Sequence, residues 1–65
     1  MQQLRIQASQ LQTGDIVGSG ETVLEVVLRS ISWPSNKVRV TLQKDDRIRS
    51  VLWGRYTIIG IKRES

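Results

Sequence analysis

Hydrophobic and polar residues alternate at every second position in several short segments of the chain. The clearest case is 37–43, where Val38, Val40 and Leu42 are separated by polar neighbours. A period of two is typical of a half-buried β-strand, and β-branched residues strengthen that preference. The pattern predicts strands at 4–8, 21–32, 37–43, 47–53 and 56–62. One short helical turn is expected within 8–12.

Turn-forming residues separate the predicted strands. They lie at 18–20, at Trp33-Pro34, at Asp45-Asp46 and at Gly54, where glycine permits a positive φ and proline fixes its own φ. Five short strands joined mainly by hairpins predict an all-β fold, a single domain over 1–65 whose bent antiparallel sheet closes into a small barrel. Because apolar residues occupy both parities of 21–32, a bulge or sharp bend is expected there.

The order of these segments resembles a known family. LQTGDIV at 11–17, a loop, a valine-rich strand and KVRVTL at 37–42 follow one another. This order is similar to that of the SH3-like barrels, including the KOW domains of ribosomal proteins and transcription factors, and to that of short phage and bacterial accessory proteins. The resemblance covers most of the chain and implies a five-stranded SH3-like barrel.

Length and composition limit how such a domain is stabilised. The chain has 65 residues and no cysteine or histidine, and a domain of this size buries only about 60% of the surface of its unfolded chain. Good packing or self-association must supply the stability, so a homo-oligomer is a candidate. The lack of cysteine, of a signal-peptide pattern and of a long apolar run favours a cytoplasmic protein that does not enter a membrane.

The sequence predicts no enzyme. Without histidine and cysteine, the usual zinc sites and the Ser/His and Cys/His nucleophiles are excluded. Asp45 and Asp46 are adjacent, so on a strand they would point to opposite faces, and a turn is the better interpretation. Gly18 and Gly20 lack the third glycine and the helix of a dinucleotide-binding motif. We expect no catalytic residue, no metal ligand and no cofactor.

Charge is spread unevenly along the chain, whose net charge is +4. Residues 1–36 hold two basic and three acidic residues, whereas 37–65 hold eight basic and three acidic residues. A basic half favours a polyanionic partner, and nucleic acid, either DNA or RNA, is the first functional hypothesis.

The predicted hairpin 37–53 is the main candidate site. If Ile48, Ser50 and Leu52 face inward, opposite the apolar residues of 37–43, the loop holds the three residues 44–46. Arginine and lysine on the outer face would neutralise phosphates, and an exposed indole would stack on a base. The candidate binding residues on this face and just after it are Lys37, Arg39, Arg47, Arg49, Trp53, Arg55 and Tyr56.

Other interpretations of the same residues remain open. Val51 beside Trp53, with Tyr56 and the arginines, also suits a protein interface, either for self-association or for docking on a host or partner protein. A third hypothesis is an oligomeric barrel that holds an anionic small molecule between subunits, and an ordinary solvated strand exterior is the remaining interpretation. Trp33 is a secondary candidate: it is either an exposed contact or, as the lack of phenylalanine favours, a cap over one barrel end.

Overall fold

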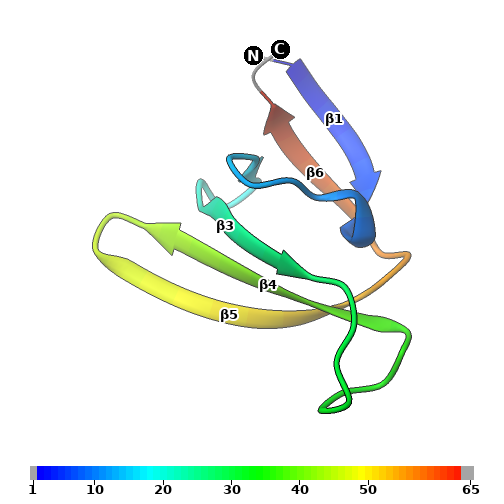
Figure 1. Cartoon of the computed structure of the whole chain (residues 1–65). Helices are drawn as coiled ribbons and strands as arrows, with labels where there is room; N and C mark the ends of the chain where they lie inside the picture. The colour runs from blue at the N-terminus through cyan, green and yellow to red at the C-terminus, as the bar shows by residue number, and fades with distance from the viewer. Residues whose placement is uncertain (1, 64–65) are drawn as a thin grey trace.

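The structure, a computed structural model that describes residues 2–63, is a bent antiparallel sheet with one short 3-10 turn (Figure 1). The all-β class is confirmed, and so is a helical turn within 8–12. No helix in the described range is long and apolar enough to span a membrane. The elements are β1 (Gln2–Gln7), η1 (Ala8–Gln10), β2 (Ile16–Val17), β3 (Thr22–Val27), β4 (Lys37–Lys44), β5 (Arg47–Gly54) and β6 (Ile58–Arg63).

The sheet is open. Its strand order is β1-β6-β2-β3-β4-β5, so β1 and β5 are the two edges, and they lie on opposite sides of the molecule (Figure 1). Six strands are present among residues 2–63, and the predicted five-stranded closed barrel is not confirmed. The additional strand, β2, has only two residues and lies between turns in which Gly14 and Gly20 adopt φ of 98° and 89°. Such a short strand carries too few positions for an alternating pattern to be visible.

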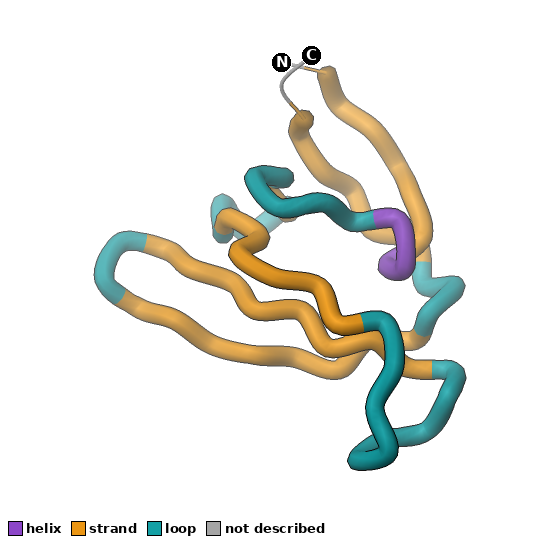
Figure 2. Tube along the Cα trace, viewed as in Figure 1, coloured by secondary structure: helices purple, strands orange, loops and turns teal. Residues whose placement is uncertain are grey.

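The hydrophobic core lies between two parts of the bent sheet, β1 and β6 on one side and β3, β4 and β5 on the other (Figure 2). The inward positions predicted for β4 are confirmed, because Val38, Val40 and Leu42 are fully buried. Burying a side chain of this kind stabilises a fold by roughly 1.5–3 kcal/mol. The buried hydrophobic residues are Ala8, Leu11, Val17, Val23, Val38, Val40, Leu42 and Ile61.

A bulge in β3 brings both of its parities to the core, as expected. Val23 lies opposite Leu42, and the next paired residue, Glu25, lies opposite Thr41. Leu24 is therefore the extra residue, and the register shift lets Val26 pack against the core on the same side as Val23.

The register of the β4–β5 hairpin differs from the predicted one. Lys44 pairs with Arg47, so the loop holds two residues, with Asp45 in the left-handed region at a φ of 57°. Two-residue loops are the commonest hairpin connections because their backbone twist can match that of the strands. The shift of one residue exchanges the faces of β5. The predicted inward orientation of β5 is therefore wrong, and the side chains that share the core-facing side with β4 are those of Val51 and Trp53.

Candidate binding surface

The corrected register divides the predicted binding residues between the two faces of the hairpin. Lys37 and Arg39 lie on the outer face, whereas Arg47 and Arg49 share the other face with Trp53. Trp53 is half-buried and packs against the hydrophobic core, so it is not an exposed stacking platform. The single basic and aromatic face predicted for this hairpin is therefore wrong.

Arg49, whose side chain is 58% exposed, forms a two-pronged ion pair with the buried Glu21. Its Nε donates to Glu21 Oε2 at 2.7 Å and its Nη2 donates to Oε1 at 2.8 Å, while the Ser19 hydroxyl also donates to Oε1 at 2.7 Å. These donors, Arg49 first, lower the pKa of Glu21 to about 2 from an ordinary 4.5. Glu21 is only 8% exposed. The Arg49 guanidinium thus holds the β2–β3 turn against β5, and its pairing with the Glu21 carboxylate reduces the positive charge that it offers to a phosphate.

Arg63, at the end of β6, has a similar role on the other side of β2. Its Nε and Nη2 donate to the two carboxylate oxygens of Asp15, each at 2.8 Å, and the backbone N–H of Gln12 donates to Asp15 Oδ2 at 2.8 Å. The Arg63 hydrogen bond is the main reason why the pKa of buried Asp15 lies below its usual range, although burial opposes the shift. This pair ties β6 to the loop before β2.

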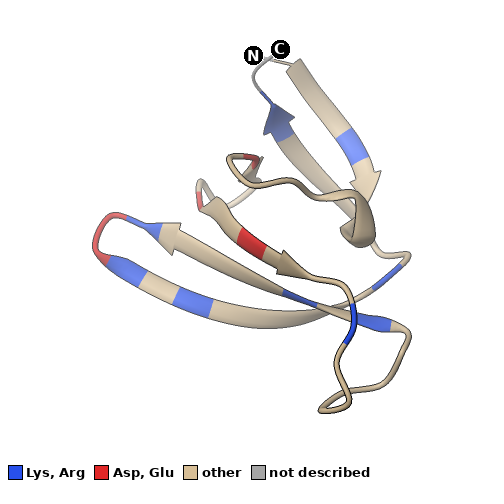
Figure 3. Cartoon of the chain, in the orientation of Figure 1, with Lys and Arg blue, Asp and Glu red and all other residues tan. Residues whose placement is uncertain are grey.

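Most of the other predicted site residues meet at one end of the molecule, which we call the basic end. It comprises the loop 28–36 and the start of β4, at the bottom of Figure 3, and the turn 54–57 at the right of the same view. Arg39 has an acidic neighbour on β3, Glu25 at 3.9 Å. Residues 26–44 and 47–63 contain no aspartate or glutamate. The charged and aromatic residues of the basic end are Arg29, Trp33, Lys37, Arg39, Arg55 and Tyr56.

Arg55 holds the loop and the turn of the basic end together. Its Nε donates to the carbonyl oxygen of Ser35 at 3.2 Å, its Nη2 donates to that of Leu28, and its backbone N–H donates to that of Asn36 at 2.7 Å. Because these partners are neutral carbonyls, Arg55 keeps its positive charge uncompensated by them. The residue therefore shapes the basic end and also contributes charge to it.

A shallow pocket of about 670 Å³ opens at the basic end. Two arginines, Arg29 and Arg55, line it together with Tyr56, whose side chain is 69% exposed. Arg29 was not among the residues predicted for the site. The signal that could have found it is its position, directly after a strand and inside a long stretch without acidic residues. The remaining lining residues are Ser30, Ile31 and Ser35.

Trp33 packs beside β4 instead of covering the core. Its indole Nε1 donates to the carbonyl oxygen of Lys37 at 3.1 Å, and the guanidinium carbon of Arg39 lies 5.5 Å from the ring centroid. Arg39 also approaches Glu25 at 3.9 Å. The described residues that pack against the core do not include Trp33, so the expected cap over a barrel end is not observed. The indole instead fixes the loop 28–36 beside an arginine.

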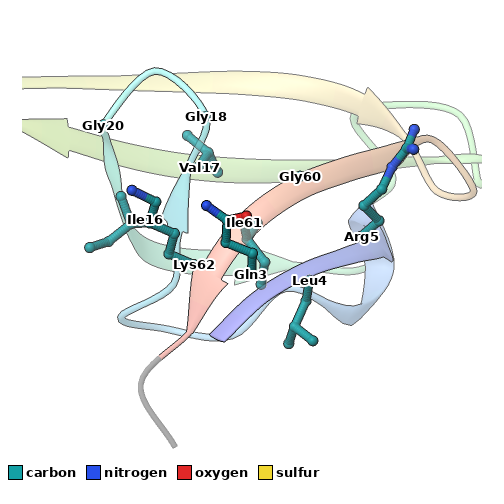
Figure 4. Close-up of a pocket in the computed structure, with 10 residues that line it drawn as sticks. All are labelled: Gln3, Leu4, Arg5, Ile16, Val17, Gly18, Gly20, Gly60, Ile61 and Lys62. Atoms are coloured by element: carbon teal, nitrogen blue, oxygen red, sulfur yellow. The ribbon is translucent and has the colours of Figure 1, made fainter. Parts of the chain in front are cut away.

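A second pocket, of about 480 Å³, lies on the part of the sheet formed by β1, β2 and β6 (Figure 4). Arg5 is opposite Gly60 in the β1–β6 pair, and Lys62 is opposite both Gln3 and Ile16. The pocket thus offers two cations, and none of its lining residues is aromatic. It lacks the combination of charge and exposed ring that is present at the basic end.

Neither a metal centre nor a relative points to a function for this chain. Among residues 2–63, no group of three or more His, Cys, Asp or Glu side chains could hold a metal ion. No protein family, curated protein or solved structure matches the sequence or the fold.

Proposed function

We propose that this chain is a small non-enzymatic nucleic-acid-binding protein and that the basic end is its binding surface. The observation that carries the proposal is the pocket in which Arg29 and Arg55 lie beside the exposed ring of Tyr56. Cations with an aromatic platform are the side chains that single-stranded nucleic acid requires. The lack of acidic residues in 26–44 and 47–63 supports the same conclusion, because a carboxylate there would repel phosphates.

The side chains of the basic end divide into two roles. Arg29 and Lys37 would neutralise phosphates and release their counterions, which is the main source of affinity that does not depend on sequence. Tyr56 would stack on one base, and Arg55 would add charge while it holds the loop in place. Stacking needs an unpaired base, so a single strand fits this surface better than a duplex. DNA and RNA both present these groups.

The proposal includes the cellular compartment, the fold relationship and an alternative partner. The absence of cysteine from the sequence fits a reducing compartment such as the cytoplasm. An SH3-like relationship is also part of the proposal, and it rests on the order of the segments 11–17 and 37–42 in the sequence. A protein partner is the alternative, and the exposed Ile48 and Leu52 of β5 favour it as a second function on a different surface.

Binding of short labelled DNA and RNA strands, followed by fluorescence anisotropy over a salt series, tests the proposal. The dissociation constant of the wild type is expected to rise steeply with salt. Arg29→Gln should lower the magnitude of the slope of log K against log salt by about one. Tyr56→Ala should weaken binding roughly tenfold or more, because one base loses its stacking partner.

Two matched variants give the controls. Tyr56→Phe keeps the ring and should bind as the wild type does, and Arg5→Gln removes the same charge from β1, from a residue that does not line the pocket of Arg29, Arg55 and Tyr56. A dissociation constant that does not change with salt would overturn the proposal. Equal effects of Arg5→Gln and Arg29→Gln would overturn the assignment of binding to the basic end.

A further inference from the structure

Strand β5 has a free edge along its whole length. Within residues 2–63 it pairs only with β4, and its eight residues pair in an uninterrupted register. It contains no proline and no bulge, two of the features that protect an edge strand from pairing with another chain. Its two charged residues, Arg47 and Arg49, lie on the core-facing side, and Arg49 is neutralised by Glu21. Every second residue therefore directs its N–H and C=O groups toward solvent, where another strand can accept and donate hydrogen bonds.

The outer face of this edge strand is apolar at two positions. Ile48 is 62% exposed and Leu52 is 49% exposed, and they lie on the same face on either side of Ser50. Their partners on β4, Gln43 and Arg39, are polar and leave them uncovered. Two exposed aliphatic residues at the same free edge indicate a surface that another strand covers.

We propose that β5 pairs antiparallel with β5 of a second copy of the chain, around a two-fold axis that lies midway between the Ser50 residues of the two copies. Opposed residues of an antiparallel pair share a face of the sheet, so one residue must lie opposite its own copy, with the axis between the two. With the axis at Ser50, Ile48 lies opposite Leu52 of the second copy, and the symmetry repeats this aliphatic pair. The exposed apolar side chains of the two copies then cover one another.

The other face of β5 is also complementary in this register. Arg47 lies opposite Trp53 of the second copy, where the guanidinium can stack on the half-buried indole, and Arg49 lies opposite Val51. No arginine is placed opposite another arginine. The ion pair between Arg49 and Glu21 is directed to the β2–β3 turn of its own chain and is retained.

The neighbouring registers are worse for identifiable reasons. An axis at Arg49 places that arginine opposite itself, and like charges directly opposite are destabilising. An axis at Val51 places Ile48 opposite Gly54 and Arg47 opposite Arg55. In the register centred on Ser50, apolar residues of β5 lie opposite apolar residues and no arginine lies opposite another. We therefore infer that the strand that pairs with the free edge of β5 is β5 of a second copy. The inference does not depend on nucleic-acid binding.

Cysteine cross-linking tests this register directly, because the chain has no cysteine of its own. In Ser50→Cys the two introduced thiols face each other at the axis, where opposed Cα atoms are about 4.5–5.5 Å apart and within reach of a disulfide. We expect a covalent dimer under mild oxidation. Thiols from Ile48→Cys and Leu52→Cys should join when the two variants are mixed, and neither variant should join to itself efficiently.

Thr41→Cys is the matched control, because Thr41 pairs with Ser50 on the same face but lies on β4, away from the edge. If Ser50→Cys cross-links no faster than Thr41→Cys, the proposed register is overturned. Sedimentation equilibrium gives an independent readout. The wild type should dimerise as concentration rises, and Ile48→Lys should weaken the dimer roughly tenfold, since both aliphatic pairs are lost. A wild type that stays monomeric at all concentrations would overturn the interface itself.

Discussion

At the scale of single residues, the arginines of this chain differ in what their charge is used for. Arg49 and Arg63 each bind a carboxylate through two nitrogens. Arg55 is held by backbone carbonyls, and Arg39 lies over the indole of Trp33. The count of basic residues therefore overstates the charge that a ligand can use. Only the cations without a carboxylate partner are expected to dominate binding.

The Glu21–Arg49 pair makes stability depend on pH. The folded-state pKa of Glu21, about 2, lies below its ordinary 4.5 because Arg49 and Ser19 donate to the ionised carboxylate. The stabilisation is fully present above the ordinary pKa and is lost as pH falls from about 4.5 through about 2. We expect the free energy of unfolding, measured in urea, to decrease over this range. In Glu21→Gln it should be lower at neutral pH and should change less over the same range.

The matched control for this measurement is Glu25→Gln. Glu25 approaches Arg39 only at 3.9 Å, and its side chain is well exposed, so its removal should leave the acid-induced loss of stability nearly unchanged. Asp15 has a pKa lowered in the same direction, which means that Glu21→Gln retains part of the dependence. Identical pH profiles for the wild type and Glu21→Gln would contradict the prediction.

At the scale of elements, the β4–β5 hairpin decides which side chains reach solvent. Its loop contains Asp45 at a φ of 57°, a conformation that aspartate tolerates and β-branched residues do not. This two-residue turn sets the register in which Val51 packs, half-buried, against the core and Ile48 is exposed. The turn thus determines both faces of the strand.

Substitution in this turn should show the difference between its two residues. Asp45→Val places a β-branched side chain at a positive φ and should lower the free energy of unfolding by about 1–2 kcal/mol. Asp45→Gly fits the same backbone and should cost less. Asp46→Val is the control, because Asp46 has no positive φ. Chemical denaturation of the three variants measures the order, and an equal loss in Asp45→Val and Asp46→Val would contradict it.

The sequence predicted the class of the fold and most elements, but it could not decide the register of β5. On this strand each parity contains two apolar residues, Ile48 and Leu52 on one and Val51 and Trp53 on the other. Hydrophobic pattern alone is therefore balanced between the two faces. The loop would have decided it, since two adjacent aspartates suit a two-residue connection better than a three-residue one.

The sequence also predicted only part of the candidate site, because local pattern shows residue type but not distant contacts. Lys37, Arg39, Arg55 and Tyr56 were identified from charge and aromatic content, and the structure places them together at the basic end with Trp33. Arg29 was missed because it lies in an irregular loop, where no alternation indicates a face. The ion pair of Arg49 with Glu21 spans 28 positions of the sequence, and that of Arg63 with Asp15 spans 48 positions. No local pattern predicts such distant partners.

At the scale of the whole molecule, the two ends of the described chain meet. Gln2 pairs with Arg63 where β1 and β6 lie antiparallel, and in Figure 1 this end of the sheet is opposite the loop 28–36. The basic end and the free edge of β5 are both separate from it. The two proposed contact surfaces, the basic end and the edge of β5, are thus separate from the paired residues Gln2 and Arg63.

Circular permutation tests this arrangement. A chain whose original ends are joined by a short flexible linker and that is opened between Asp45 and Asp46 should fold, because the opening lies at an exposed turn. The control permutant is opened between Val40 and Thr41, inside β4 and next to a fully buried valine, and should not fold. Circular dichroism with urea denaturation measures both. Equal stability of the two permutants would contradict the prediction.

The pairing of Gln2 with Arg63 has a practical consequence for tethering. A polypeptide fused before Gln2 and one fused after Arg63 would leave the sheet side by side and pointing the same way. A support, a fluorophore or a second domain could be attached through either end and would face away from the loop 28–36. In a tandem fusion of two such domains, the linker would join the ends near Gln2 and Arg63, and the loop 28–36 of each domain would face away from the linker.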